Sequence, residues 1–511
     1  MKSLSPDICA LRFSTGTTHE VSEEFSLPDY MPEIARVLRL NAVLLPEEHF
    51  AGSDGVEFSG RIEYRLLYSD AAGEITEAPL EGRYRYRIAC GVENAVPYTE
   101  EKIESVGARP TAPRKLSIRT RIYARPHLLC EETRGAHLSD MVGEAPVEAV
   151  WGNTPLLERA VASSGVLHKE ERFLIEETSP DALTLLSVQS ALLPEGVEAH
   201  DGYLSARGKL IYTLLLKKAG ECPFIKVYTV PFEEEITATE ARAGDAVSLS
   251  AFLGTPALTF EAEGDGCAVL LDAEYSLLCV LSRNRSFSYL KDFYVHGERH
   301  EITRKSFSSY SLVGAGMGNF TVGGAPALPA EFKKQGTLLP HFSLKEANAT
   351  LVGERVIVEG VLLSHLLSFG EEETDKCELA LPFRAELPLG GAVAAGDSVS
   401  FTVTPTAGSA QLAGDGVRLS TEILVSACVL RPVSLSLPEG ARKLEEITIN
   451  DPNAVVIYYP KDGDSLWSVG KRYGVSLALL KEQNGIPEDE DADAACASSL
   501  DGYAYLFVRG L

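Results

Sequence analysis

Most of the chain alternates apolar and polar residues with the period of two that is typical of half-buried β-strands. The clearest stretch covers residues 60–68, GRIEYRLLY, and Phe58 extends it before the glycine. A similar stretch begins at Gly208 and a weaker one at Gly360. The three glycines, of which Gly60 is the first, lie 148 and then 152 positions apart. The repeat therefore has the size of a whole domain rather than of a solenoid unit.

Further strands keep register with these glycines. Residues 227–232 and 378–383 alternate again, with Pro231 and Pro382 at 23 and 22 positions after their glycines. Turn-rich loops separate each pair of strands. A final strand closes each copy, at 116–123, 269–281 and 417–430. We therefore expect a mainly β protein built from repeated, β-sandwich-like domains.

Two short helices are also predicted, each 28 residues before its glycine. Residues 32–38 and 180–186 both begin with proline and carry apolar residues at helical spacing. The matching place in the third copy has the sequence Glu331-Phe332-Lys333-Lys334. The third copy is therefore predicted to be degenerate or truncated.

The stretch 306–340 is rich in glycine and predicts a linker. At 511 residues the chain exceeds a single core. We therefore divide the chain into six segments. The first β-rich domain covers 1–150 and the second covers 151–305, and a Gly-rich linker at 306–340 separates them from a degenerate third domain at 341–432. A linker at 433–452 leads to a C-terminal module at 453–511.

The C-terminal module has a different pattern, a strand, two helices and a strand. Residues 455–459 predict the first strand, and Asp464 is placed to cap a helix that begins at Ser465 and stops at Gly474. A second helix starts after Ser476 and ends at 484–485. A closing strand is expected over 503–508. The module is thus a small α+β unit of βααβ order.

Residues 463–469, GDSLWSV, with Val475-Ser476 and Asn484-Gly485, resemble the LysM family. The resemblance implies a ligand groove between the loop that enters the first helix and the loop that leaves the second, where backbone amides bind N-acetyl groups of glycans. The candidate binding residues are Gly463, Asp464, Ser465 and Leu466 on one side and Asn484, Gly485, Ile486 and Pro487 on the other. The alternative is that these residues only cap and turn the chain.

Trp467 is one of two tryptophans. Its helical position beside Leu466 predicts partial exposure and a contact with a binding partner, because exposed tryptophans are frequent interface anchors. Rim packing is the alternative.

The net charge of the chain restricts the kinds of partner that it is expected to bind. The formal net charge of −26 disfavours nucleic acid and anionic membrane. The acidic run 488–491, with Asp493, is an insertion predicted beside the groove, and it favours a basic protein partner.

Residues 27–34, LPDYMPEI, with 60–68, resemble the SPOCS family of spore-coat-associated proteins in endospore-forming Firmicutes. SPOCS copies followed by a LysM module imply a non-catalytic adaptor in spore coat assembly, which binds the coat morphogenetic ATPase through its LysM module. It would act in the mother-cell cytoplasm at the forespore surface, with its β-rich domains as a scaffold or self-association platform. The alternatives are a protein that binds peptidoglycan or N-acetylglucosamine in the cell wall or spore cortex, and a phage-associated structural protein.

Catalytic and metal sites are not predicted. Residues 463–466 spell the GDSL motif of an esterase class, but only 46 residues follow Ser465 and the last histidine is His365. The nine scattered cysteines contain no CxxC pair. We therefore expect no metal and no cofactor. The amino terminus lacks a secretory pattern and no apolar run approaches a membrane span, which predicts a cytoplasmic protein.

Overall fold

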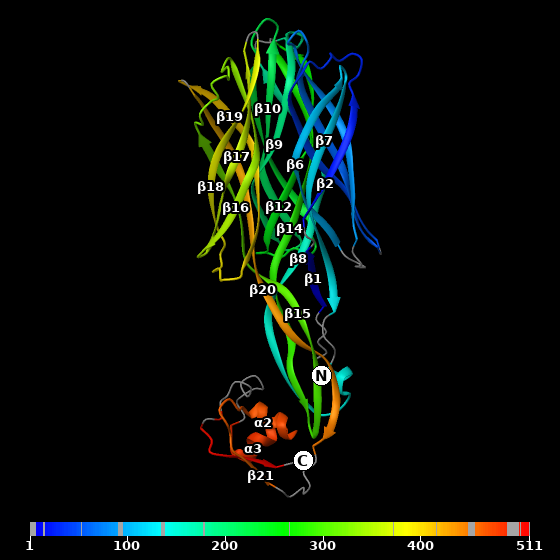
Figure 1. The fold of residues 1–511 in the computed structure, drawn as a ribbon, viewed down its shortest axis with the longest axis vertical. Helices are drawn as coiled ribbons and strands as arrows, with labels where there is room; N and C mark the ends of the chain where they lie inside the picture. The colour runs from blue at the N-terminus through cyan, green and yellow to red at the C-terminus, as the bar shows by residue number, and fades with distance from the viewer. Residues whose placement is uncertain are drawn as a thin grey trace.

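The computed structural model describes residues 7–13, 16–52, 54–89, 96–133, 138–176, 179–264, 266–370, 373–414, 416–447, 455–487, 500 and 502–509. The fold is mainly β, and its α-helices lie in the lower half of the molecule as drawn in Figure 1. The fold class predicted from the alternation is confirmed.

The first β-rich repeat is a pair of packed sheets. One sheet has the order β3-β4-β5, and the other has the order β1-β7-β2 with β6 also paired to β7. The strands are β1 (Asp7–Phe13), β2 (Thr17–Ser26), β3 (Arg36–Gly52), β4 (Gly55–Ser69), β5 (Ile75–Ile88), β6 (Val96–Ala112) and β7 (Lys115–Thr133). Alternate residues of β4 point into the core between the sheets, where the Tyr64 hydroxyl lies 2.8 Å from Thr120 Oγ1.

The second repeat has the same arrangement. Its sheets have the orders β9-β10-β11 and β12-β14-β13, with β8 also paired to β14. The elements are β8 (Val147–Ile175), the 3-10 turn η1 (Pro180–Ala182), β9 (Leu183–His200), β10 (Tyr203–Lys218), β11 (Phe224–Thr237), β12 (Ala246–Leu253), β13 (Ala257–Glu263) and β14 (Gly266–Val295).

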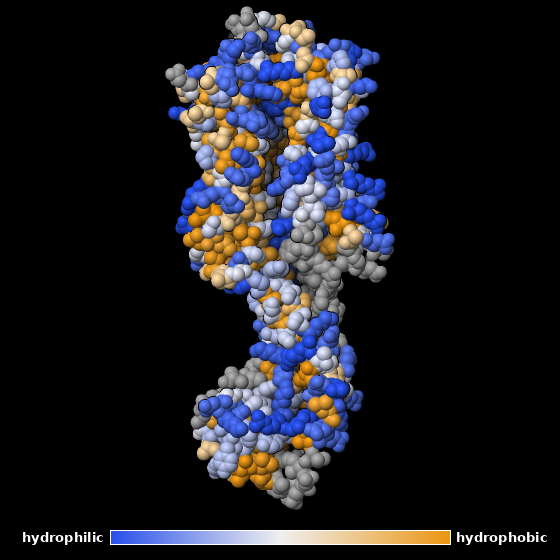
Figure 2. All heavy atoms as spheres, in the orientation of Figure 1, coloured by the Kyte–Doolittle hydropathy of each residue, from blue (hydrophilic) through white to orange (hydrophobic). Residues whose placement is uncertain are grey.

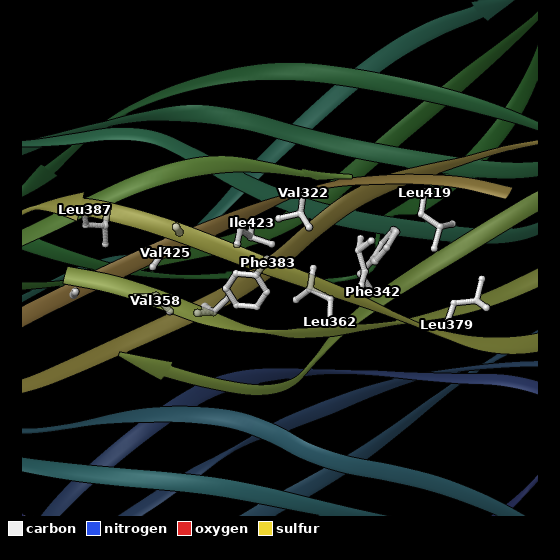
Figure 3. Packing of buried hydrophobic residues seen from close by; sticks show 14 of the residues in the cluster. Val322, Phe342, Val358, Leu362, Leu379, Phe383, Leu387, Leu419, Ile423 and Val425 are labelled. Carbon is white, nitrogen blue, oxygen red and sulfur yellow. The ribbon is translucent and has the colours of Figure 1, made fainter. Parts of the chain in front are cut away.

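The third repeat is complete, with sheets of order β16-β17-β18 and β15-β20-β19. Its strands are β15 (Glu298–Gly324), β16 (Thr337–Val352), β17 (Arg355–Phe369), β18 (Thr374–Pro388), β19 (Ser398–Ala413) and β20 (Gly416–Glu446). Figure 3 shows side chains such as Val358, Leu362 and Phe383 meeting Ile423 and Val425 between the two sheets. The prediction that this copy is degenerate is wrong.

The recurring glycine has a steric cause that all three repeats share. Each glycine pairs across the sheet with an aromatic residue, which is Tyr84, Phe232 or Phe383. A Cβ on Gly208 would lie 2.4 Å from the Leu193 carbonyl oxygen and 2.7 Å from the Phe232 ring. Gly60 and Gly360 are equally crowded. Only glycine leaves room for the aromatic ring at this point of the strand.

The two predicted helices are absent. Strand β3 begins at Arg36, and in the second copy the turn η1 is followed at once by β9. Ile34 and Leu38 are buried, but not in a helix: Leu38 belongs to β3, which pairs with β4, and the Ile34 amide donates to the Pro113 carbonyl oxygen at 2.7 Å. A seven-residue segment gains too little from its own hydrogen bonds to form a helix when a strand partner is present. The third copy has therefore lost no helix.

The predicted linkers are also largely strand. Residues 306–324 belong to β15, which pairs along β20, and 433–446 belong to β20. Gly314 and Gly316 lie where β15 passes close to the end of β18: a Cβ on Gly314 would be 2.0 Å from the Leu389 carbonyl oxygen. Close packing, rather than flexibility, thus accounts for these glycines. Residues 448–452 lie outside the described part of the chain.

The three repeats meet at a shared junction. Leu67, Leu215 and Leu367, which keep the spacing of the glycines, are buried together there with residues of the preceding strands. A polar group lies beside them: Arg39 donates to Ser187 Oγ at 3.1 Å, and Ser187 donates to Glu77 at 2.6 Å. Burial lowers the pKa of Arg39 to about 10 and raises the pKa of Glu77. The junction therefore joins apolar contacts to a buried ionic network.

Four long strands continue beyond the sandwiches as a stalk (Figure 1). In the stalk β14 pairs with β8 as far as Val295, and β15 pairs with β20 from Glu298. The short helix α1 (Leu138–Val142) precedes β8. The C-terminal module lies against the end of this stalk and contains β21 (Val455–Tyr458), α2 (Leu466–Tyr473), α3 (Leu477–Asn484) and β22 (Leu506–Arg509). Its predicted βααβ order is confirmed.

Candidate functional site in the C-terminal module

The first loop of the candidate groove is held by the start of α2. Ser465, rather than Asp464, caps this helix: its hydroxyl accepts from the Ser468 amide at 3.2 Å, and Ser468 Oγ accepts from the Ser465 amide at 2.9 Å. These bonds satisfy amides that the helix itself leaves unpaired. The Ser465 hydroxyl thus has a structural partner, and the sequence contains no histidine after His365.

Asp464 instead ties the loop to the sheet. Its carboxylate accepts from the Tyr458 hydroxyl and, at 2.9 Å, from the Lys461 amide. The hydrogen bond from Tyr458 is the main reason that the pKa of Asp464 lies below its usual value, and the hydrogen bond from the Lys461 amide lowers it further. Arg472 donates to the same Tyr458 hydroxyl at 2.7 Å. Gly463 precedes this network with a φ of 86° and stays exposed, which leaves the tip of the loop open to a ligand.

The second loop is fixed by Asn484. Its Nδ2 donates to the carbonyl oxygens of Leu480 and Phe507, both at 2.8 Å, and its Oδ1 accepts from the Phe507 amide at 2.6 Å. Gly485 ends α3 with a left-handed φ of 65°. Gly485 and Pro487 are exposed. The loop that leaves α3 is therefore rigidly attached to β22 and presents its own tip outward.

The two loops share one apolar core. Leu466 is buried and Ile486 packs against the same cluster, so both serve the core more than the surface. Of the predicted site residues, Gly463, Gly485 and Pro487 are exposed, and Asp464, Ser465 and Asn484 are partly exposed. The acidic run 488–491 and Asp493 lie outside the described residues.

Trp467 departs from its prediction. Only 6% of its surface is exposed, because the ring packs edge-on against Tyr294 of β14 at a centroid distance of 4.9 Å. Its Nε1 donates to Asp292 at 3.0 Å. The predicted partial exposure is wrong, since the helix face beyond Leu466 is covered by the stalk, which no local pattern reveals.

Further contacts fix the module to the stalk. Lys471 donates to both oxygens of Asp292, at 2.7 and 2.6 Å, and the Tyr294 hydroxyl donates to the Val475 carbonyl at 2.8 Å. Glu148 accepts from the Leu477 amide at 3.1 Å. These contacts come from α2, the turn after it and the first residue of α3, whereas the exposed Gly463 precedes α2 and the exposed Gly485 follows α3. The stalk thus holds the module in one orientation. Asp292 and Tyr294 carry no sequence signal that links them to it.

None of the helices within the described residues is long and apolar enough to cross a bilayer.

Comparison with protein families identifies a LysM domain at residues 461–490. The match covers α2, α3 and both candidate loops, and it confirms the resemblance of the module. LysM is a binding module, of the kind that binds peptidoglycan and other N-acetylglucosamine glycans, and not a catalytic one. Neither the curated proteins nor the solved structures contain a match to this chain.

Proposed function

We propose that this protein is a non-catalytic adaptor in endospore coat assembly, which presents its LysM domain to a protein partner while the three β-rich repeats act as a scaffold or self-association platform. The observation that carries the proposal is the docked module: the stalk covers Trp467 and fixes α2, and the tips of both candidate loops stay exposed. A rigid module at the end of a long stalk suits presentation of a binding surface at a distance from the scaffold.

The proposed partner is the coat morphogenetic ATPase, and the proposed place of action is the mother-cell cytoplasm at the forespore surface. Two features support this choice. Residues 27–34 and 60–68 resemble the SPOCS family, and the chain carries a net charge of −26. Long-range attraction of a basic partner surface would raise the association rate.

A second candidate is a protein that binds N-acetylglucosamine glycans of peptidoglycan or spore cortex, and the LysM match favours it. Full-length protein titrated by calorimetry with the purified ATPase and, separately, with N-acetylglucosamine oligomers separates the two. We expect binding of the ATPase that weakens as salt is raised. Binding of the oligomers without any binding of the ATPase would overturn the adaptor proposal.

A variant locates the binding site. Pro487→Arg places a positive charge on an exposed loop tip, so it should weaken ATPase binding about tenfold without changing the melting temperature. Pro110→Arg, on the exposed edge of the first repeat, is the control and should bind as the wild type does. The full chain is required, because the isolated module would expose Trp467 and create a false binding surface.

A further inference from the structure

Large apolar side chains are exposed on β21, on β22 and on residues next to these two strands. They form a set that we call the aromatic face, made up of Val455, Ile457, Tyr459, Tyr503, Tyr505 and Phe507, each 39% to 67% exposed. Within the described residues, sixteen large hydrophobic side chains are strongly exposed, and six of them belong to this set. Figure 2 shows hydrophobic atoms at the lower end of the molecule, where Figure 1 labels β21. Such a concentration of exposed apolar side chains indicates a binding surface.

Strand alternation accounts for the part of the aromatic face that lies on β21 and β22. Val456, Tyr458, Leu506 and Val508 point inward to the helices, so their neighbours point outward. Ile457 and Phe507 lie directly opposite each other across the two strands. The exposed apolar area is on the order of 500 Å², which is at the upper end of what a monomeric protein leaves uncovered.

We propose that the aromatic face is a second contact surface for the protein partner of the LysM domain, and that it receives an amphipathic segment whose apolar side is flanked by Lys or Arg. This inference rests on the proposed adaptor function and extends its binding surface beyond the two loops.

The aromatic face is continuous with the candidate groove. Asn484 of the second loop exchanges hydrogen bonds with the backbone of Phe507, at 2.8 and 2.6 Å. On the other side, the Leu500 amide donates to the Asp464 carbonyl at 3.4 Å, and Tyr503 in turn donates to Leu500 at 3.0 Å. A partner seated on the loops therefore reaches the aromatic face without a gap.

Ring geometry favours a protein segment over a glycan. A sugar chain stacks on aromatic rings that lie in one plane, whereas the Tyr505 and Phe507 rings are inclined by 76° at a centroid distance of 5.2 Å. Val455 and Ile457 are aliphatic and offer no stacking surface. An edge-to-face pair beside β-branched side chains instead forms the kind of irregular apolar surface into which protein side chains pack.

Charge specifies the flanks of that segment. Six acidic residues stand in the sequence between α3 and β22, at 488–491, 493 and 501, and the whole chain carries a net charge of −26. A second copy of this chain would bring like charges together, while a partner with Lys or Arg beside its apolar residues would not. Two apolar surfaces of this size would bury roughly 1,000 Å² in total, enough for a specific contact when the loops add to it.

The test uses the full-length chain, the purified coat morphogenetic ATPase and the double variant Ile457→Thr/Phe507→Thr. Threonine is itself favoured in strands, so the sheet should still form while the apolar surface is removed. We expect ATPase affinity to fall at least tenfold, as for exposed anchors at the centre of an interface. Val227→Thr, at a residue 57% exposed on β11, is the matched control and should bind normally.

Hydrogen exchange of the complex gives a second measurement that does not depend on a variant. We expect the ATPase to protect residues 455–458 and 505–508 as well as the two loops. Protection of the loops alone, together with unchanged affinity of the double variant, would overturn this inference and leave the adaptor function intact. Absence of any ATPase binding by the wild type would overturn both.

Two other occupants have their own signatures. If the wild type is a dimer by light scattering and the double variant is a monomer with normal ATPase affinity, the aromatic face joins two copies and our proposal is wrong. If the double variant instead loses affinity only for N-acetylglucosamine oligomers, the occupant is a glycan and the proposal is equally wrong.

Discussion

Glycine and aromatic residues define the repeat at the scale of single side chains. Gly60, Gly208 and Gly360 each lie close to an aromatic ring of the following strand in the sheet. A carbonyl oxygen of the preceding strand also lies within contact distance of the position that a Cβ would take. Conformational freedom is not the cause, because none of these three glycines has a positive φ. The cause is contact distance, so the positions tolerate no Cβ.

Gly208→Ala should therefore destabilise the second repeat by roughly 2 to 4 kcal/mol, because the added Cβ meets both the Leu193 carbonyl and the Phe232 ring. Thermal unfolding of the full chain measures the loss. Gly107→Ala is the control, since nothing lies within 4 Å of its Cβ, and it should leave the melting temperature nearly unchanged. Equal melting temperatures for the two variants would contradict the steric explanation.

Helix α2 shows how one element serves two contacts. Its inward face packs Leu466 and Val469 in the core of the module, and the neighbouring face carries Trp467 and Lys471 to Asp292 of the stalk. Gly470 permits this approach, because a Cβ there would lie 2.5 Å from the Tyr294 hydroxyl. The helix is thus both part of the binding module and its attachment to the scaffold.

Asp292→Ala should loosen this attachment. It leaves the Trp467 indole nitrogen and the Lys471 ammonium without their shared acceptor, which weakens docking by about 2 kcal/mol. We expect faster hydrogen exchange in α2 and red-shifted Trp467 fluorescence, measured in a Trp151→Phe background. Glu439→Ala, which breaks an exposed ion pair with Lys305 on the same stalk, is the control and should change neither signal.

At the scale of the whole molecule, the junction of the three repeats decides their arrangement. Leu67, Leu215 and Leu367 supply apolar contacts, and the buried Arg39, Ser187 and Glu77 supply directional ones. Breaking a buried network is costly, so such groups specify one arrangement of the repeats. His341 lies in the same region, with its ring 6.4 Å from that of His365.

The junction should make stability depend on pH through His341. Burial, and then the nearby charge of Arg39, lower the pKa of His341 from 6.5 to about 3. Below pH 6.5 the unfolded chain therefore binds a proton that the folded chain does not, and stability falls by up to about 1.4 kcal/mol per pH unit as the pH drops toward 3.

Chemical denaturation between pH 7 and 4 measures this slope. His341→Gln should flatten it relative to the wild type, because the titrating group is gone. His168→Gln removes an exposed histidine and should keep the wild-type slope. If His341→Gln keeps that slope as well, the junction does not hold this histidine neutral.

Local patterns in the sequence predicted the strands and the LysM module, because alternation and helix caps act between near neighbours. The three-fold repetition was predicted from the recurrence of one such pattern along the chain. Ser476, Gly474 and Gly485 behave as their types suggest. Tertiary structure alone decided that residues 36–38 and 306–324 are strands, since their hydrogen-bond partners lie far along the chain. It also buried Trp467, because Asp292 and Tyr294 stand some 175 residues earlier and only the folded stalk brings them to the helix.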